Sequence, residues 1–432
     1  MPIEHVETLI IGGGQAGLAL SHMLSRRDRQ HLVLERGRIA ERWRTERWDG
    51  LRFQFPNWSV RLPDFPLAHA DPDAFATSGE IVDFLSAYAD FIAAPVRCGV
   101  AVTALRRRPG TSGFVAETSN GPIEAANVVV ATGPYQRPIV PALLAEDAGF
   151  FQVHASLYRE PDQLPAGAVL IVGSGASGAQ IAEELVRAGR PVYLSVGRHR
   201  RMPRRYRGRD LIWWLSAMGL DQTPVENRGP DKSLPLITGA YGGHTIDFRH
   251  FATQGVTLLG RVAAARDGTL DLALDLADSL AFGDAAYTAF LDRADAHVAQ
   301  HGLDMPEEPA ARAVQPDPPC LVKPLRRLDL HGAGISAVIW ATGYGCDFSW
   351  IDAPVLDARG EPVHRGGITD VPGLYFIGLQ WLSKMNSSFL AGVGDDAARL
   401  ADHIAGQKGG RSRQPGGNRS RSCRPETPDQ GP

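Results

Sequence analysis

The chain has 432 residues, enough for two or three domains that each bury a core. Hydrophobic residues make up 44% and charged residues 22%, with a net charge of -3, so no global field favours nucleic acid or an anionic membrane. The 4 cysteines form no Cys-x-x-Cys pair and the 13 histidines show no metal-ligand spacing. We therefore expect neither a redox dithiol nor a metal site. Apolar runs are of strand length and no signal sequence is recognisable, so we expect a cytoplasmic protein.

The first strand–turn–helix pattern begins with an apolar run at residues 6–11, followed by a helix over 15–25 and a strand over 31–35. Three glycines at the turn suit a tight bend, a close approach to a pyrophosphate, and close helix–strand packing. The second strand ends in a glutamate that can accept hydrogen bonds from both ribose hydroxyls, which favours FAD or NAD. The predicted cofactor contacts here are Gly12, Gly14, Gln15, Ala16, Gly17, Glu35 and Arg36.

The pattern repeats with a strand over 168–172, a helix over 176–188 and a strand over 191–195. No acid stands at its ribose position; serine and arginine there suit a 2′-phosphate and hence NADPH. A third near-match at Gly392 lacks a following strand–helix–strand unit, but two complete matches argue against chance spacing. The predicted contacts are Gly173, Gly175, Ala176, Ser177, Gly178, Ser195, Arg198 and Arg200.

The rest of the chain is less regular. Residues 198–209 hold seven arginines, and we interpret those at 204–209 as solvated. Trp213, Trp214 and Met218 form an apolar cluster at helical spacing, which indicates core, with a substrate entrance as the alternative. Residues 262–302 have helical spacing. The tail at 406–432 has no large apolar residue, so we expect it to be disordered and solvated.

Two further segments, 128–133 and 338–343, are apolar strands that each end in Ala-Thr-Gly. They resemble the strands that close each nucleotide fold in flavoproteins with two dinucleotide domains. The resemblance implies an α/β protein with two doubly wound, Rossmann-type domains. It divides the chain into an FAD domain at 1–155 and 331–405, an NADPH domain with a helical insertion at 156–330, and the tail at 406–432. It adds cofactor contacts at Ala131, Thr132, Gly133, Ala341, Thr342 and Gly343.

Over residues 5–405 the chain more closely resembles the class B flavin-containing monooxygenases. The resemblance is carried by Arg-Trp-Arg at 42–44, Leu-Arg-Phe-Gln-Phe-Pro-Asn at 51–57, Leu-Pro-Asp-Phe-Pro at 62–66, Phe-Gln-Val-His-Ala-Ser-Leu-Tyr at 151–158, and Tyr-Phe-Ile-Gly at 375–378 before a helix over 395–405. It implies FAD contacts at Trp43, Arg44, Gly378, Gly394 and Asp395, and catalytic roles for Asn57 and His154. The alternatives are a turn residue for Asn57, a structural linker residue for His154, and domain packing for Trp43 and Arg44.

The function that the resemblance implies is an FAD-dependent monooxygenase. It uses NADPH and O2 through a C4a-hydroperoxyflavin to oxygenate a small organic substrate. Tyr158 stands where the Baeyer–Villiger enzymes have tryptophan, which favours N- or S-oxygenation. An NADPH oxidase, or another FAD/NAD(P)-dependent oxidoreductase without oxygen insertion, is the alternative, and a non-catalytic flavin sensor is a third. We expect no nucleic-acid or membrane partner, and the sequence leaves a homodimer open.

Overall fold

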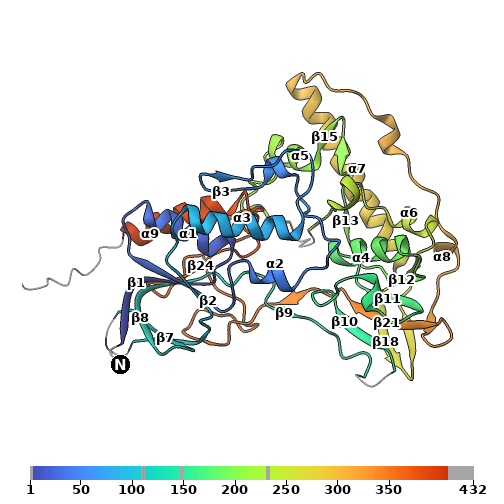
Figure 1. Cartoon of the computed structure of the whole chain (residues 1–432). Coiled ribbons are helices and arrows are strands. Elements are labelled where there is room, and N and C mark those ends of the chain that lie inside the picture. Colours follow the sequence, from blue (N-terminus) through green and yellow to red (C-terminus); the bar gives the residue numbers. More distant parts are fainter. Residues whose placement is uncertain (1–2, 109, 111, 146–148, 230–233, 407–432) are drawn as a thin grey trace, which may run out of the picture.

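The computed structural model describes residues 3–108, 110, 112–145, 149–229 and 234–406. The predicted tail lies outside these residues, except for its first residue. Figure 1 shows two lobes side by side, each built on its own sheet, with helices packed against the sheets. The expected fold class, α/β with two dinucleotide-type folds, is confirmed.

The first lobe is built on a sheet with the strand order β23-β6-β7-β8-β1-β2-β5, and β24 pairs with β8. The strands β1, β2, β5, β8 and β24 run parallel, while β7 runs antiparallel to both of its neighbours, β6 and β8. The bounds are β1 Glu4–Ile11, β2 His31–Glu35, β5 Val96–Cys98, β6 Val102–Arg107, β7 Phe114–Thr118, β8 Ile123–Val130, β23 Ile351–Asp352 and β24 Leu374–Phe376.

Helices α1 (Gln15–Ser25), α3 (Ser78–Phe91) and α9 (Val393–Gly406) pack together in this lobe (Figure 1). Helix α3 begins at a capping box: the Thr77 side chain accepts from the Glu80 N–H, and the Glu80 carboxylate accepts from the Thr77 N–H. The last four residues of β1 and of β8 are all buried, as their apolar runs predict.

The second lobe has an all-parallel sheet in the order β10-β21-β11-β12-β17. Helix α4 (Ala176–Arg187) follows β11 and contacts both β11 and β12, which completes the second dinucleotide fold. The strand bounds are β10 Phe151–His154, β11 Ala168–Val172, β12 Val192–Ser195, β17 Thr257–Leu259 and β21 Ile335–Trp340.

The chain crosses between the lobes at two places that lie side by side. The crossing segments contain β9 (Arg137–Pro138) and β22 (Tyr344–Gly345), which pair with each other in antiparallel fashion. Both β10 and β21 belong to the second sheet, so the crossings fall near 131–150 and 341–350. The domain limits expected from the sequence, 155 and 331, differ because an apolar strand pattern does not reveal which sheet the strand joins.

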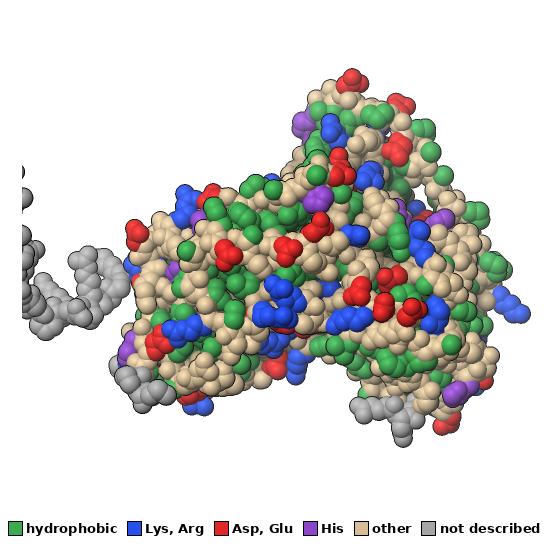
Figure 2. Space-filling view, in the orientation of Figure 1, with side chains coloured by type: hydrophobic (Ala, Val, Ile, Leu, Met, Phe, Trp, Pro, Cys, Tyr) green, Lys and Arg blue, Asp and Glu red, His purple; other side chains and the backbone are tan. Residues whose placement is uncertain are grey.

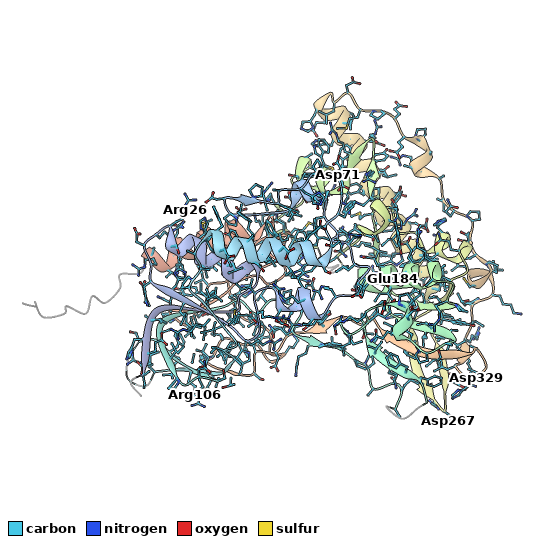
Figure 3. All side chains as sticks on the ribbon, in the orientation of Figure 1. Arg26, Asp71, Arg106, Glu184, Asp267 and Asp329 are labelled. Carbon is cyan, nitrogen blue, oxygen red and sulfur yellow. The ribbon has the colours of Figure 1, made fainter. Side chains whose placement is uncertain are left out.

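The expected helix over 262–302 is only partly right. A hairpin of β18 (Val262–Arg266) and β19 (Thr269–Leu272) comes first, and β20 (Arg327–Asp329) joins it in a small antiparallel sheet. Helix α7 (Leu276–His301) follows and rises from the second lobe in Figure 1. Asp267 and Asp329 mark the outer edge of the small sheet at the lower right of Figure 3.

The remaining elements are short. Helices are α2 Glu41–Thr45, which lies between the lobes in Figure 1, α5 Leu211–Ala217, α6 Phe248–Thr253 and α8 Pro319–Val322. Short strand pairs are β3 Arg61–Leu62 with β4 Phe65–Pro66, β13 Arg200–Arg201 with β16 Pro235–Leu236, and β14 Arg205–Tyr206 with β15 Arg209–Asp210. No helix in the described part of the chain is long and apolar enough to cross a membrane.

Helix α5 supports the core interpretation of the tryptophan cluster, because Trp214 is fully buried. The interpretation of the arginines at 204–209 as solvated is wrong for Arg204. The residue is 1% exposed. It holds Asp210 through two nitrogens at 2.8 and 2.9 Å and donates to the Gln54 carbonyl at 2.7 Å. A buried arginine needs such partners, and here they tie the second lobe to a loop that follows α2.

Candidate functional site

A cavity of about 1010 Å³ lies between the lobes and is lined from both. Figure 2 shows Lys and Arg side chains gathered near the middle of this face, where the lobes meet. The predicted site residues that line the cavity are Gly12, Gly14, Gln15, Ala16, Glu35, Arg36, Trp43, Ala131, Thr132, Gly133, His154, Gly175, Ala176, Ser177, Arg198, Ala341, Gly343 and Gly378. Those that do not are Gly17, Arg44, Asn57, Gly173, Gly178, Ser195, Arg200, Thr342, Gly394 and Asp395.

The three glycines of the first fingerprint have three different surroundings. Gly12 has φ +119°, and a Cβ there would lie 2.5 Å from the Ala131 carbonyl oxygen. A Cβ on Gly17 would overlap the Gly12 carbonyl oxygen, so this glycine lets α1 pack onto the turn. At Gly14 a Cβ would have no atom within 4 Å, because that side opens into the cavity. This is the arrangement that a bound pyrophosphate requires.

The second fingerprint repeats this geometry. Gly173 has φ +107° and abuts the Ala341 carbonyl, and a Cβ on Gly178 would overlap the Gly173 carbonyl oxygen. The space beside Gly175 is again empty within 4 Å. In each fold the first glycine therefore presses against the alanine of the Ala-Thr-Gly segment, which explains why the two motifs occur together.

Both fingerprint helices leave their first N–H groups available to a ligand. Gly14 is the N-cap residue of α1 and Gly175 that of α4, and neither glycine offers a side chain to cap the helix. Uncapped N–H groups at a helix start attract anions, and here both sets lie at the cavity wall. The cavity thus has two places that suit a pyrophosphate.

Glu35 lies at the end of β2 with its carboxylate oriented by backbone groups. Its Oε2 accepts from the Gly13 N–H at 2.8 Å and its Oε1 from the Gly37 N–H at 2.9 Å. A carboxylate oxygen can accept more than one hydrogen bond, so both oxygens keep capacity for ribose hydroxyls. The residue fits the role predicted for it at the first nucleotide site.

The arginines beside Trp43 are placed differently from the expectation. Arg44 turns away from the cavity and donates to Ile39 O and Ser86 Oγ, both at 3.2 Å. Instead Arg42 and Arg47 line the cavity, with the Arg47 guanidinium 5.0 Å from the Trp43 ring centre. The motif indicated that arginines cluster here. Because α2 is short and its N-cap residue Ala40 has a left-handed backbone conformation, helical periodicity could not predict which arginines face the cavity.

The second ribose position carries a cation rather than an acid. Arg198 lines the cavity, whereas Ser195 is buried and its hydroxyl donates to the Gly260 carbonyl at 3.0 Å. Ser174 was not predicted; its Oγ accepts from the Gly197 N–H at 3.0 Å and fixes the turn before Arg198. Arg200 lies on β13, outside the cavity wall, and has an interaction within the protein.

His154 lines the cavity at the end of β10, but both ring nitrogens are engaged. Its Nε2 donates to the Gly343 carbonyl at 3.1 Å, so Nδ1 is the acceptor and receives the Ser156 N–H at 3.1 Å. Burial lowers the pKa of His154, which favours the neutral ring. These contacts hold one crossing segment against the other; the catalytic role stays a prediction.

Asn57 is 1% exposed and does not line the cavity, although Phe55, two residues before it, does. Its Nδ2 donates to the Asp71 carbonyl at 3.0 Å, while its Oδ1 is buried with no hydrogen-bond partner. An unpaired buried acceptor is uncommon, because it loses a hydrogen bond to water without replacing it. Its role in catalysis also stays a prediction.

The C-terminal helix is placed near, rather than on, the cavity wall. Gly394 packs against Pro63, and Asp395 forms an ion pair with Lys384. The residues that reach the cavity from this region instead come from the preceding loop, including Ser388, whose carbonyl accepts from Gln15 Nε2 at 2.6 Å. The helix begins two residues earlier than expected, at Val393.

One end of the cavity is apolar and aromatic. The ring centres of Phe53 and Phe55 are 5.3 Å apart, and those of Phe55 and Phe389 are 5.0 Å apart. Other apolar residues of the lining include Ile212, Leu215, Leu236, Ile237 and Met385. Two of them come from α5, so the tryptophan-bearing helix serves the core on one side and the cavity on the other.

The described residues contain no group of three or more His, Cys, Asp or Glu side chains placed to hold a metal ion. Cys98, Cys320 and Cys346 are free thiols. The absence of a metal and of a redox dithiol therefore remains an expectation for the whole chain.

Two dinucleotide fingerprints that open onto one cavity define an oxidoreductase built from two dinucleotide folds. A family model described as pyridine nucleotide-disulphide oxidoreductase matches residues 9–218. A CzcO-like uncharacterized oxidoreductase of Geobacillus kaustophilus (strain HTA426) is 33% identical over 405 residues, 92% of this chain and 98% of that one. The chain therefore belongs to the family of CzcO-like oxidoreductases.

Two other proteins show the wider relationship. The probable indole-3-pyruvate monooxygenase YUCCA1 of Arabidopsis thaliana is 33% identical over 195 residues, 44% of this chain and 46% of that one. The solved structure of a flavin-containing monooxygenase from Stenotrophomonas maltophilia has a TM-score of 0.63 at 18% identity and covers 93% of this chain and 98% of that one. The second likeness shows a shared fold. Together these findings confirm the recognised class, an oxidoreductase related to the flavin monooxygenases.

Proposed function

We propose that the protein is an FAD-dependent monooxygenase that takes electrons from NADPH and inserts one atom of O2 into a small organic substrate. The observation that carries the proposal is a single cavity that two fingerprints open onto and that ends in an apolar aromatic wall. When bound, FAD and NADPH supply hydride transfer and oxygen activation, which side chains cannot perform. The names of the YUCCA1 and Stenotrophomonas proteins support the same class of reaction.

The residues of the first lobe would hold FAD. The N–H groups at the start of α1 bind the pyrophosphate, which can approach closely because Gly14 has no side chain. Glu35 accepts from the ribose hydroxyls, in an orientation already set by the N–H groups of Gly13 and Gly37. Arg36 and Arg47 bring positive charge to the same wall, whereas Arg42 is paired there with Glu46 at 2.6 Å.

The residues of the second lobe would hold NADPH. The start of α4 and the bare edge of Gly175 repeat the pyrophosphate site. Arg198 stands where a ribose-binding acid would otherwise be, and a guanidinium binds a 2′-phosphate through two parallel hydrogen bonds. The preference for NADPH over NADH rests on this residue.

The aromatic end of the cavity would exclude water from the reacting atoms. The ring of Phe55 lies against those of both Phe53 and Phe389, and the three rings form an apolar surface. Because the lining residues grouped around Phe55 are apolar, we propose that the substrate is uncharged and apolar. We favour oxygenation at nitrogen or sulfur over insertion next to a ketone carbonyl.

The test is a measurement of product and hydrogen peroxide for each NADPH consumed. The purified protein should carry FAD, lose its yellow colour with NADPH under anaerobic conditions, and convert a neutral aryl methyl sulfide to its sulfoxide in air. An aryl sulfide that carries a carboxylate is the matched control and should be a poorer substrate. If the peroxide released equals the NADPH consumed with every sulfide, amine and ketone tested, the protein is an oxidase. An ester formed from a ketone would favour Baeyer–Villiger chemistry. A protein that does not bleach with NADPH would point to a sensor.

A further inference from the structure

The guanidinium of Arg198 rests on an aromatic ring from a distant part of the chain. Its central carbon lies 3.9 Å from the centre of the Phe282 ring, on helix α7. Within the described residues no acidic side chain pairs with Arg198. Arg198 lines the cavity and Phe282 does not, so the ring supports the cation on one side and leaves the cavity side to a ligand.

The next residue, His199, is held by the same turn of α7. It is buried, its Nδ1 donates to the Gly197 carbonyl at 3.0 Å, and its ring meets Phe248 edge-on at 4.7 Å. A Cβ at position 283 would lie 2.6 Å from the His199 Nε2, so only glycine admits the histidine here. Residues 282 and 283 thus contact residues 198 and 199 pairwise.

Helix α7 is itself fixed to this part of the second lobe. Asp284 pairs with Arg201 at 2.9 Å and with Arg249 at 2.7 Å, and the Arg201 guanidinium lies 4.3 Å from the Tyr287 ring centre. Arg201 and Arg249 are both largely buried, so these contacts resist solvent screening. The ring of Phe282 is therefore a fixed support rather than a loose surface group.

We infer that α7 determines coenzyme selectivity by positioning Arg198: Phe282 holds the guanidinium plane in the orientation that receives an adenosine 2′-phosphate. This inference rests on the proposed NADPH site. A long arginine side chain otherwise loses rotamer freedom when it binds a phosphate, and a support that orders it beforehand lowers that loss. Stacking on an aromatic face is the means available, since it leaves the N–H edge free.

The test measures binding of two probes to the FAD-loaded protein by calorimetry: 2′,5′-ADP, which carries the 2′-phosphate, and 5′-AMP, which lacks it. Phe282→Leu removes the ring and Phe282→Tyr keeps it. Ala285→Ser, on an exposed position of the same helix, is the control for effects on α7. We expect Phe282→Leu to weaken the binding of 2′,5′-ADP roughly three- to tenfold and the binding of 5′-AMP less than twofold. Phe282→Tyr should bind both probes like the wild type.

A double-mutant cycle with Arg198→Ala then separates this inference from the proposed function. If Phe282 acts through Arg198, Phe282→Leu should have no further effect on 2′,5′-ADP once the arginine is gone. Equal losses for both probes, or a loss that persists in the Arg198→Ala background, would overturn the inference and leave the NADPH site standing. If Arg198→Ala alone leaves 2′,5′-ADP binding unchanged, the assignment of Arg198 fails and this inference fails with it.

Discussion

At the scale of single residues, the middle glycines of the fingerprints differ from their neighbours in a way that can be tested. Gly14 has an extended backbone, φ -85° and ψ -174°, which any residue can adopt, and nothing lies within 4 Å of its missing Cβ. The fold therefore does not require glycine at position 14; glycine there leaves space for a ligand. The third glycine, Gly17, serves the fold.

We expect Gly14→Val to fold normally and to lose FAD. The free energy of unfolding of the apoprotein should change by no more than about 0.5 kcal/mol, the usual range for a surface substitution, while the valine side chain occupies the pyrophosphate space. Gly17→Ala is the contrasting variant. Its Cβ would overlap the Gly12 carbonyl oxygen, so both the amount of bound FAD and the thermal stability should decrease. The measurements are bound FAD per chain and thermal unfolding without FAD. A Gly14→Val protein with full FAD would refute the placement of the pyrophosphate.

Asn57 gives a second prediction at this scale. Its Oδ1 is buried without a hydrogen-bond partner, and its place two residues after Phe55 of the cavity lining leads us to predict a role in the oxygenation step. Asn57→Ala should leave FAD reduction by NADPH intact, but raise the peroxide released per NADPH in the presence of an accepted sulfide. Ser59→Ala, which removes a hydroxyl bonded to the Pro56 carbonyl at 2.7 Å in the same turn, controls for damage to the turn. Equal peroxide yields in the wild type and Asn57→Ala would assign Asn57 to the turn alone.

At the scale of elements, the sequence predicted the parts that have a strong local signal. The strands β1, β2, β11 and β12 and the helix α1 lie at or close to the expected positions, because buried parallel strands read as apolar runs and the glycines mark the turns between them. The hairpin of β18 and β19 was mistaken for helix, since its alanines and leucines also fit a helical period. The signal that identifies it is Asp267-Gly268, both at positive φ, a preferred pair for a two-residue hairpin turn.

The parts that the sequence did not predict depend on contacts between distant segments. Arg204 looked like its exposed neighbours, yet it is buried because Asp210 and the Gln54 carbonyl lie within reach in the folded chain. Arg198 and Phe282 are 84 positions apart in the sequence, and no pattern in either segment predicts their contact. The positions of Trp48 and Leu51 are a similar case, since they follow a first-lobe helix but are buried in the core of the second lobe.

Arg204 provides a prediction about how the short elements are joined. Its Nε and Nη2 hold the carboxylate of Asp210, which also caps α5 by accepting from the Ile212 N–H at 2.8 Å. Arg204→Met should therefore destabilise the protein by about 3–5 kcal/mol, because the buried carboxylate loses its cation. The denaturant midpoint measures the loss. The double variant Arg204→Met with Asp210→Ser, which retains a cap but no charge, should recover part of it. A midpoint unchanged in Arg204→Met would show that this pair contributes little.

At the scale of the whole molecule, the junction of the lobes contains a half-buried acid. Glu184, labelled near the junction in Figure 3, accepts from the Tyr158 hydroxyl at 2.7 Å and packs against Gly50. Burial raises the pKa of Glu184 above its usual value of 4.5, and the nearby carboxylate of Asp49 adds to the effect. The folded state thus binds the Glu184 proton more tightly than the unfolded state does.

The sign of the pH effect follows. Glu184 contributes stability while it is protonated, and this contribution is lost as the pH rises from about 4.5 through its folded pKa. Glu184→Gln, which cannot ionise, should therefore be more thermally stable than the wild type near neutral pH, with the difference in Tm shrinking toward acid pH. A difference in Tm that is constant between acid and neutral pH would contradict the raised pKa.

The adjacent residue supplies a control of opposite sign. Burial raises the pKa of Glu183, but its partners His244 and Arg187 outweigh that effect and hold it below 4.5. Its stabilising contribution is present above the unfolded pKa and is lost as the pH falls. Glu183→Gln should therefore lower the Tm near neutral pH, and the deficit should shrink toward acid pH.

The paired crossings between the lobes give the chain a modular character. The Ile139 N–H donates to the Gly343 carbonyl at 3.0 Å, and the Thr342 hydroxyl donates to the Ile139 carbonyl, so the point where the chain leaves the first lobe touches the point where it returns. In genetic terms the coenzyme-binding lobe is one insertion with adjoining ends. To exchange it for the lobe of a relative, the chain must be joined at two points that lie next to each other in the structure. The new lobe must also provide a surface that fits Gln54, Trp48 and Leu51 of the first lobe. Coenzyme preference could thus be inherited, or engineered, as one unit while the site proposed for FAD stays in place.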